Sequence, residues 1–97
     1  MSTLLVINLP PALEEDLIDY LLSQDTVSGF TSYETMGHGE HGTLSIAEQV
    51  SGRRKRLQFE LLLDDQAAFE SIVSGLGSQV GTDIRFWEQP VRNMGST

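Results

Sequence analysis

Apolar and polar positions along the chain follow a strand-like pattern in four short segments. Residues 3–9 (TLLVINL) are almost all apolar and branched, as in a strand buried on both faces. Residues 56–63 (RLQFELLL) alternate regularly between apolar and polar side chains, as in a strand with one buried face. Residues 29–36 (GFTSYETM) alternate less regularly. Residues 83–91 (DIRFWEQPV) predict a last strand, which Pro90 is expected to end.

Two longer segments repeat apolar residues every three or four positions, which predicts helices. Residues 10–24 begin with prolines and acidic residues, which favour a helix N-terminus, and residues 64–76 begin with Asp64 or Asp65 as a cap. The apolar stripe of the first helix is expected to consist of Leu13, Leu17, Ile18, Leu21 and Leu22. The stripe of the second is expected to consist of Ala68, Phe69, Ile72, Val73 and Leu76. Residues 77–81 (GSQVG) then predict a turn.

The predicted order of elements is strand, helix, strand, strand, helix, strand. This is the βαββαβ order of ferredoxin-like folds, in which right-handed crossovers place both helices on one face of a four-stranded antiparallel sheet. The predicted fold class is therefore α+β, with a long loop between strands 2 and 3. We expect a single domain over residues 1–92 and a loose C-terminal tail over residues 93–97.

The other face of this sheet is predicted to carry Tyr33, Leu62 and Trp87. Apolar side chains on an uncovered sheet face usually mark an association surface, so we expect an oligomer. The alternative is a monomer in which these residues are scattered.

Composition narrows the classes of function. The net charge of −8 argues against nucleic acid as the main partner, because phosphate backbones are bound by basic surfaces. The absence of cysteine excludes disulfides and thiol chemistry. The apolar run near the N-terminus is too short for a signal peptide or a membrane span. A cytoplasmic protein without direct membrane insertion is expected.

Residues 36–56 (MGHGEHGTLSIAEQVSGRRKR) hold both histidines and four of the nine glycines. His38, Glu40 and His41 offer two imidazoles and a carboxylate, which suit zinc, copper or nickel. A complete site would need further ligands, from Glu48 or from a neighbouring subunit. The alternative is that both histidines are exposed in a glycine-rich turn.

The middle of this segment predicts a short helical turn, with Ser45 as cap. Such a turn can dock a protein partner, or it can fold back onto its own oligomer. The residues of this docking turn are Leu44, Ile46, Glu48, Gln49 and Val50.

The segment ends in four consecutive cations. On a strand, Arg53 and Lys55 would share one face, and Arg54 and Arg56 the other. Arginine suits planar recognition of phosphate or carboxylate, so these residues are candidates for holding an anionic effector. The alternatives are a solvated surface or salt bridges between subunits.

The chain as a whole resembles the PII-like superfamily, and within it a small bacterial family. The motifs that carry the resemblance are Gly37-His38-Gly39 at the end of the second strand and Glu48-Gln49-Val50-x-Gly52-Arg53-Arg54 before the third. The resemblance implies homotrimers formed through the sheets and a T-loop-like insertion at about residues 37–53. It also implies an effector site between subunits and, by analogy, a membrane transporter or other protein as partner.

The resemblance makes five residues the candidates for binding an anion or nucleotide: Gly37, Gly39, Arg53, Arg54 and Arg85. PII proteins that bind adenine nucleotides carry a lysine in the loop before the last strand. Residues 77–87 contain none, so ATP or ADP is less favoured here. CutA-like proteins share the same architecture, and that resemblance favours the alternative of a divalent metal bound by His38, Glu40 and His41.

The sequence presents no assembled catalytic constellation. The paired carboxylates Glu14–Glu15 and Asp64–Asp65 stand where helix N-termini favour negative charge. The expected function is therefore that of a PII-like regulatory protein and not an enzyme, with divalent metal binding as the alternative.

Overall fold

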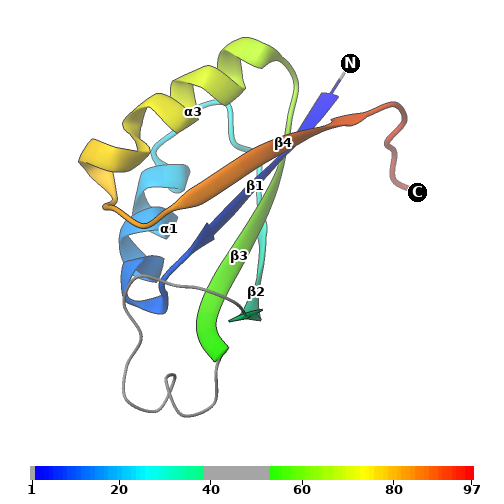
Figure 1. Ribbon diagram of the computed structural model, residues 1–97. Helices are drawn as coiled ribbons and strands as arrows, with labels where there is room; N and C mark the ends of the chain where they lie inside the picture. Colours follow the sequence, from blue (N-terminus) through cyan, green and yellow to red (C-terminus); the bar gives the residue numbers. More distant parts are fainter. Residues whose placement is uncertain (1, 39–52) are drawn as a thin grey trace.

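The computed structural model describes residues 2–38 and 53–97. Four strands and two α-helices follow one another in this part of the chain in the predicted βαββαβ order, which confirms the ferredoxin-like α+β fold (Figure 1). Their bounds are β1 Ser2–Leu9, α1 Glu14–Leu22, β2 Thr31–His38, β3 Arg53–Leu63, α3 Gln66–Gln79 and β4 Arg85–Val91, with a 3-10 turn at Pro11–Leu13 before α1.

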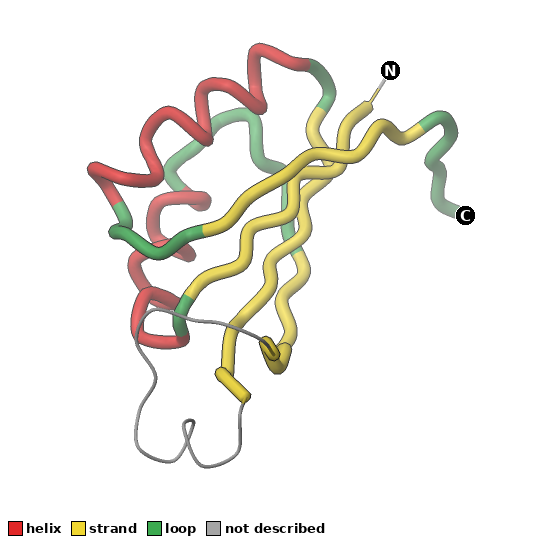
Figure 2. Tube along the Cα trace, in the orientation of Figure 1, coloured by secondary structure: helices red, strands yellow, loops and turns green. Residues whose placement is uncertain are grey.

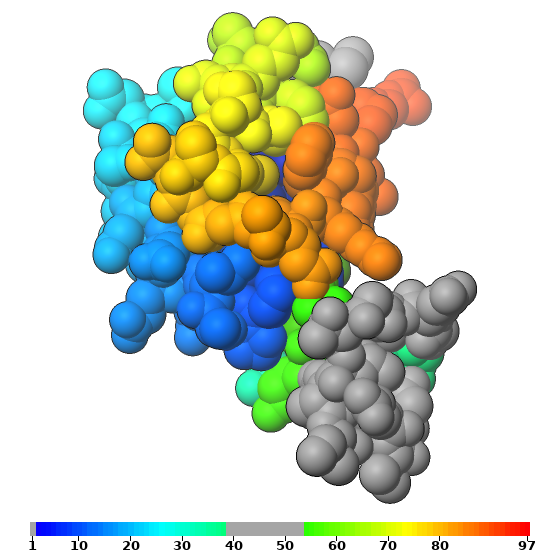
Figure 3. Space-filling view, turned by 60° about the vertical axis from the view of Figure 1, so that its left-hand side comes forward, coloured from blue at the N-terminus to red at the C-terminus, as the bar shows by residue number. Residues whose placement is uncertain are grey.

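The strands form one antiparallel sheet in the order β2-β3-β1-β4. Both helices lie on the same face of this sheet, as the red and yellow segments of Figure 2 show. In the space-filling view, side chains of α1 and α3 form a continuous surface beside β4 (Figure 3). The opposite face of the sheet, called the open face below, carries no helix among the described residues.

The hydrophobic core lies between the sheet and the helices. Alternate side chains of β1 and β3 point into it, because successive residues of a strand face opposite sides. The core residues from the two strands are Leu5, Ile7, Leu9, Leu57, Phe59, Leu61 and Leu63. Those from the helices and the α3 C-cap are Leu17, Leu21, Ala68, Ile72, Leu76 and Val80. The alternation predicted for the third strand is confirmed, and β1 has no exposed residue among Ser2–Leu9.

The predicted helix starts are confirmed in part: Pro11–Leu13 form a 3-10 turn and α1 begins at Glu14, whereas α3 begins after one of the two predicted caps. Asp65 is the N-cap of α3, and its Oδ1 accepts a hydrogen bond from the Ala68 amide at 2.9 Å. Leu22 was expected in the buried stripe of α1, yet it is 69% exposed. It is the last residue of the helix, and its position in the helical turn lies beyond the width of the stripe that faces the core.

Three predicted boundaries are wrong. Residues 77–79 do not form a turn, because α3 continues to Gln79 before Gly81 turns the chain at a φ of 155°. Pro90 does not end the last strand but pairs with Thr3 inside β4, which is an edge strand and tolerates a missing amide donor. The hairpin of β2 and β3 is longer than predicted, since His38 still pairs with Arg53.

Candidate anion site

The open face of the sheet carries both apolar and polar side chains. Trp87 is 42% exposed, and Tyr33 and Leu62 are exposed to a similar degree, as the sequence predicts. The strand register places Arg54, Arg56 and Arg85 on this same face: Asn8 pairs with both Gln58 and Arg85, and Arg54 and Arg56 precede Gln58 at steps of two.

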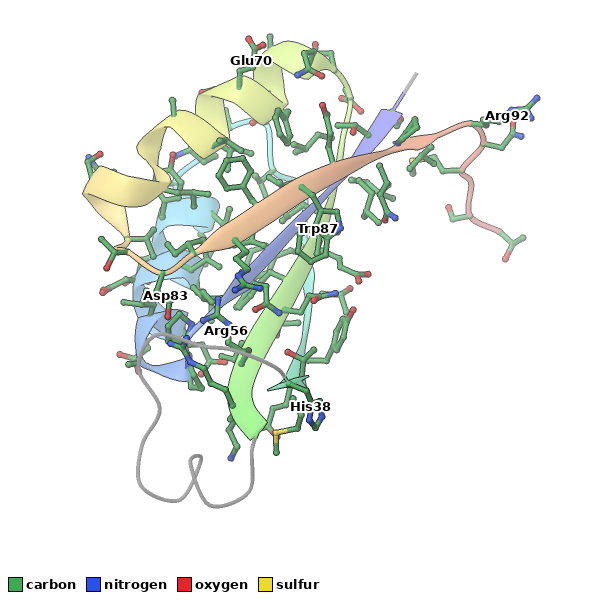
Figure 4. All side chains as sticks on the ribbon, viewed as in Figure 1. His38, Arg56, Glu70, Asp83, Trp87 and Arg92 are labelled. Atoms are coloured by element: carbon green, nitrogen blue, oxygen red, sulfur yellow. The ribbon has the colours of Figure 1, made fainter. Side chains whose placement is uncertain are left out.

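Arg54 and Arg56 contact Asp83 at the end of the sheet where β2 ends and β3 begins, and Arg85 is close enough to act on the charge of Arg56. We call Arg54, Arg56 and Arg85 the arginine cluster. Arg54 and Arg56 both form salt bridges with the Asp83 carboxylate, the latter at 3.1 Å between Nη1 and Oδ2. Figure 4 shows Arg56 and Asp83 side by side, with His38 at the same end of the sheet and Arg92 at the opposite end.

Arg56 is the fixed centre of the cluster. Its side chain is only 4% exposed, although it lies on the open face. Nε donates to Asn8 Oδ1 at 2.6 Å, and Nη2 donates to the carbonyl oxygens of Asn8 and Asp83, each at 2.9 Å. Burial of a guanidinium is tolerated only when its donors are satisfied in this way.

The charges of the cluster perturb one another. Burial lowers the pKa of Arg56, and the positive charges of Arg54 and Arg85 act in the same direction, while Asp83 opposes them. Partial burial by itself would raise the pKa of Asp83. The hydrogen bonds and charges of Arg54 and Arg56 outweigh that effect and hold the pKa of Asp83 below its usual range.

A chain of hydrogen bonds extends from the cluster across the open face. Asn8 Nδ2 donates to Gln58 Oε1 at 3.1 Å and to Thr35 Oγ1 at 3.3 Å. Gln58 Nε2 donates to the Tyr33 hydroxyl at 2.8 Å, and that hydroxyl donates to Glu60 at 2.5 Å. The bond to Glu60 is the largest cause of a raised pKa of Tyr33. The network thus joins β1, β2 and β3 to the loop before β4.

The structure brings together part of the predicted effector site. Gly37 pairs with Arg54, and Arg54 and Arg85 lie in the cluster. Arg53 pairs with His38 at the ends of β3 and β2. The remaining candidates, Gly39, Glu40, His41, Leu44, Ile46, Glu48, Gln49 and Val50, lie outside the described residues.

Sequence reasoning missed the two residues that organise the cluster, Asp83 and Asn8. Asn8 is the one polar side chain inside the apolar run 4–9, and that exception signals a buried polar contact. Asp83 adopts a φ of 63°, a left-handed conformation that Asp tolerates better than most residues. No periodicity marks a loop residue of this kind.

Of the three predicted metal ligands, His38, Glu40 and His41, only His38 lies in the described part of the chain. His38 is exposed at the end of β2. Within residues 2–38 and 53–97, no three His, Cys, Asp or Glu side chains are grouped so that they could hold a metal ion. Within the same residues, no helix has the length and apolar character needed to cross a membrane.

Solved structures of other proteins share this fold. A crystal structure of a DUF3240 family protein from Shewanella baltica OS155 matches with a TM-score of 0.80 and 21% identity, over 99% of this chain and 96% of that one. The periplasmic divalent cation tolerance protein CutA from Archaeoglobus fulgidus matches with a TM-score of 0.71 and 9% identity, over 97% and 87%. A protein thought to be a PII-like signaling protein, from Thermus thermophilus, matches with a TM-score of 0.62 and 17% identity, over 91% and 84%.

At these identities the likeness concerns the fold, which is the one that CutA and PII-like proteins share, as the sequence motifs suggest. No curated protein sequence matches the chain. The family model described as "Protein of unknown function (DUF3240)" matches residues 1–97. The chain therefore belongs to the DUF3240 family, within the PII-like and CutA-like fold group.

Proposed function

We propose that this protein is a PII-like regulatory protein whose effector is a small anion bound at the arginine cluster. Binding there would bias the segment between β2 and β3, and so change its affinity for a protein partner. The protein is expected to act in the cytoplasm and not as an enzyme.

One observation carries this proposal. Arg54 and Arg56 of β3 converge on Asp83, and Arg85 of β4 is close enough to act on the charge of Arg56, in a chain whose net charge is −8. The cluster is therefore a local positive site on an acidic protein, and guanidinium groups suit planar anions such as phosphate and carboxylate. It lies at the base of the segment 39–52, so an anion bound there is next to both ends of that segment.

Anion binding can be tested by calorimetric titration at constant ionic strength, with phosphate, bicarbonate, ATP and ADP. We expect a micromolar to millimolar response to at least one of them, reduced about tenfold or more by Arg54→Ala or Arg85→Ala. Arg92→Ala is the matched control, because it removes the same charge at the opposite end of the sheet (Figure 4). Silence across the panel, or an equal loss with Arg92→Ala, would contradict the proposal.

The partner is proposed to dock on the turn formed by Leu44, Ile46, Glu48, Gln49 and Val50, and a membrane transporter is one candidate class. A pull-down with the full chain and with a variant in which residues 39–51 are replaced by a short glycine linker tests this. We expect capture by the full chain only, and capture that changes when the effector is added. Equal capture by both chains would place the docking surface elsewhere.

We further propose that the protein is a homotrimer associated through the open face of the sheet. The support is that Trp87, Tyr33 and Leu62 are exposed on a face without helices in the described part of the chain. Association would cover these side chains and place the arginine cluster beside a neighbouring subunit.

Divalent metal binding is the second candidate function. It rests on the exposed His38 at the end of β2, next to Glu40 and His41 in the sequence, and on the likeness of the fold to CutA. Titration with Zn²⁺, Cu²⁺ and Ni²⁺ tests it. We expect a heat of binding at micromolar metal concentration in the wild type and none in His38→Ala. An unchanged heat of binding in that variant would exclude His38 as a metal ligand.

A further inference from the structure

Asp83 pairs with Arg54 and Arg56 of the arginine cluster as an internal anion. Its carboxylate accepts from both Arg54 and Arg56, and its side chain is still 43% exposed on the outer side. Its main-chain carbonyl is held separately, by Arg56 Nη2 at 2.9 Å. The loop backbone therefore has an anchor that does not depend on where the carboxylate points.

The three arginines do not depend on Asp83 to the same extent. Arg56 donates to Asn8 as well as to the main chain of Asp83, so it stays in place without the carboxylate. The hydrogen bond and salt bridge of Arg54 both go to the Asp83 carboxylate. Arg85 is exposed on β4, which β1 separates from β3, and it is close enough to act on the charge of Arg56. Arg54 can therefore exchange the Asp83 carboxylate for another anion, and Arg85 is exposed for a ligand.

Charge defines the class of ligand that fits. Three guanidinium groups and one carboxylate leave a formal excess of two positive charges. A compact dianion neutralises that excess, and its oxygens can accept from two guanidinium groups at once. Inorganic phosphate and the terminal phosphate of an ester have this charge and size, whereas a monocarboxylate has half the charge.

We infer that Asp83 is a built-in competitor of the effector: a phosphate-class dianion binds Arg54 and Arg85 by displacing the Asp83 side chain from Arg54, while Arg56 holds the loop backbone. This inference rests on the proposed anion-binding function and adds to it the ligand class and the residue that limits its affinity. The displacement needs only a rotation of the Asp83 side chain, whose outer side is already solvated.

The experiment compares phosphate binding by the full-length wild type, Asp83→Asn, Asp83→Asn/Arg54→Ala and Asp64→Asn. Asparagine keeps a hydrogen-bond acceptor for the arginines but removes the competing charge, and Asp64→Asn removes the same charge from an exposed site outside the cluster. Sulfate and acetate at equal ionic strength serve as dianion and monoanion probes. Trp87 is the chain's only tryptophan and lies on the open face two residues from Arg85, so its fluorescence reports both folding and binding.

We expect Asp83→Asn to bind phosphate and sulfate about tenfold more tightly than the wild type, with acetate much weaker. Adding Arg54→Ala should abolish the gain, and Asp64→Asn should bind like the wild type. If Asp83→Asn does not fold, as judged by its circular dichroism, Asp83→Ser replaces it in the same comparison.

Two results would overturn the inference and are distinguishable from failure of the proposed function. If the wild type binds phosphate and Asp83→Asn binds it equally or more weakly, Asp83 is part of the site and not a competitor, but the proposed function stands. If neither chain binds phosphate or sulfate, the inference is wrong, and the proposed function depends on the other anions of the panel.

Discussion

Arg56 can be a buried charged residue because two neighbours, Asn8 and Asp83, supply acceptors for its guanidinium group. Asn8 provides two oxygens and Asp83 two more, from a strand and a loop separated by most of the sequence. Removing one partner of such a group leaves a costly unsatisfied donor, whereas the intact set is nearly neutral in free energy. The ionised Asp83 carboxylate therefore adds to stability through Arg54 and Arg56, while Asn8 and the Asp83 carbonyl keep Arg56 in place.

The contribution of the Asp83 carboxylate to the free energy of unfolding should depend on pH. The pKa of Asp83 is lower in the folded chain than in the unfolded chain, so its contribution is complete above the unfolded pKa of about 3.9. It disappears as the pH falls through the folded pKa. Solvent screens the exposed side of this carboxylate, so we expect Asp83→Asn to reduce the free energy of unfolding by only about 1 kcal/mol at pH 7. This difference should shrink below about pH 4.

Urea unfolding of the wild type and Asp83→Asn between pH 3 and pH 7 measures that difference. Asp64→Asn is the control and should stay within about 0.5 kcal/mol of the wild type at pH 7. A difference between wild type and Asp83→Asn that grows as the pH falls would contradict the assignment.

Gly75 is required by the contact between the two helices. A Cβ at this position would overlap the Tyr20 hydroxyl, which donates to the Ile72 carbonyl at 2.7 Å. Gly75→Ala should therefore lower the free energy of unfolding by about 2 kcal/mol, the usual cost of overpacking. Gly77→Ala, in the same helix with open space around it, should be neutral or stabilising by up to about 1 kcal/mol.

Urea unfolding of both alanine variants decides this, and equal effects at the two glycines would contradict it. Gly75→Ala should cost less stability in a Tyr20→Phe background than in the wild type, because Tyr20→Phe removes the hydroxyl that lies nearest to the added Cβ.

At the scale of elements, the stability of α3 depends on the N-cap at its start. Asp65 caps the helix through the Ala68 amide, whereas Asp64 is exposed one position earlier. We expect Asp65→Ala to cost about 1 kcal/mol of stability and Asp64→Ala less than about 0.5 kcal/mol. Thermal unfolding followed by circular dichroism distinguishes the two variants. A larger loss of stability with Asp64→Ala would show that Asp65 is not the cap.

At the scale of the whole molecule, the two faces of the sheet differ in how they are covered. The helices bury one face, and the open face leaves Trp87 exposed beside the polar network. If the trimer forms through the open face, Trp87→Glu should produce monomers in size exclusion with light scattering. Leu22→Glu is the matched control, because Leu22 is exposed on α1, on the other side of the sheet. Dissociation by Leu22→Glu alone would place the interface on the helices.

The sequence by itself determined the order of the elements and most of the core. The period-two run at residues 57–63 could be buried in only one way, because strand side chains alternate between faces, and the apolar run at residues 4–9 predicts a strand buried on both faces. A cap at Asp64 or Asp65 and the exposed apolar residues Tyr33, Leu62 and Trp87 follow from the same local rules, and the structure selects Asp65 as the cap. Local rules place element ends less well, as Leu22 and Pro90 show.

Only the tertiary structure decided which residues the arginines of the basic run 53–56 contact. A strand pattern places Arg54 and Arg56 on one face, but it does not say that Asp83, in a loop before another strand, reaches that face and binds both. It also does not say that Asn8 accepts two hydrogen bonds from Arg56. The sheet order β2-β3-β1-β4 and the left-handed backbone conformation of Asp83 bring these residues together, although they are distant in sequence. The physical reason is that electrostatic pairing depends on distance in space and not on spacing along the chain.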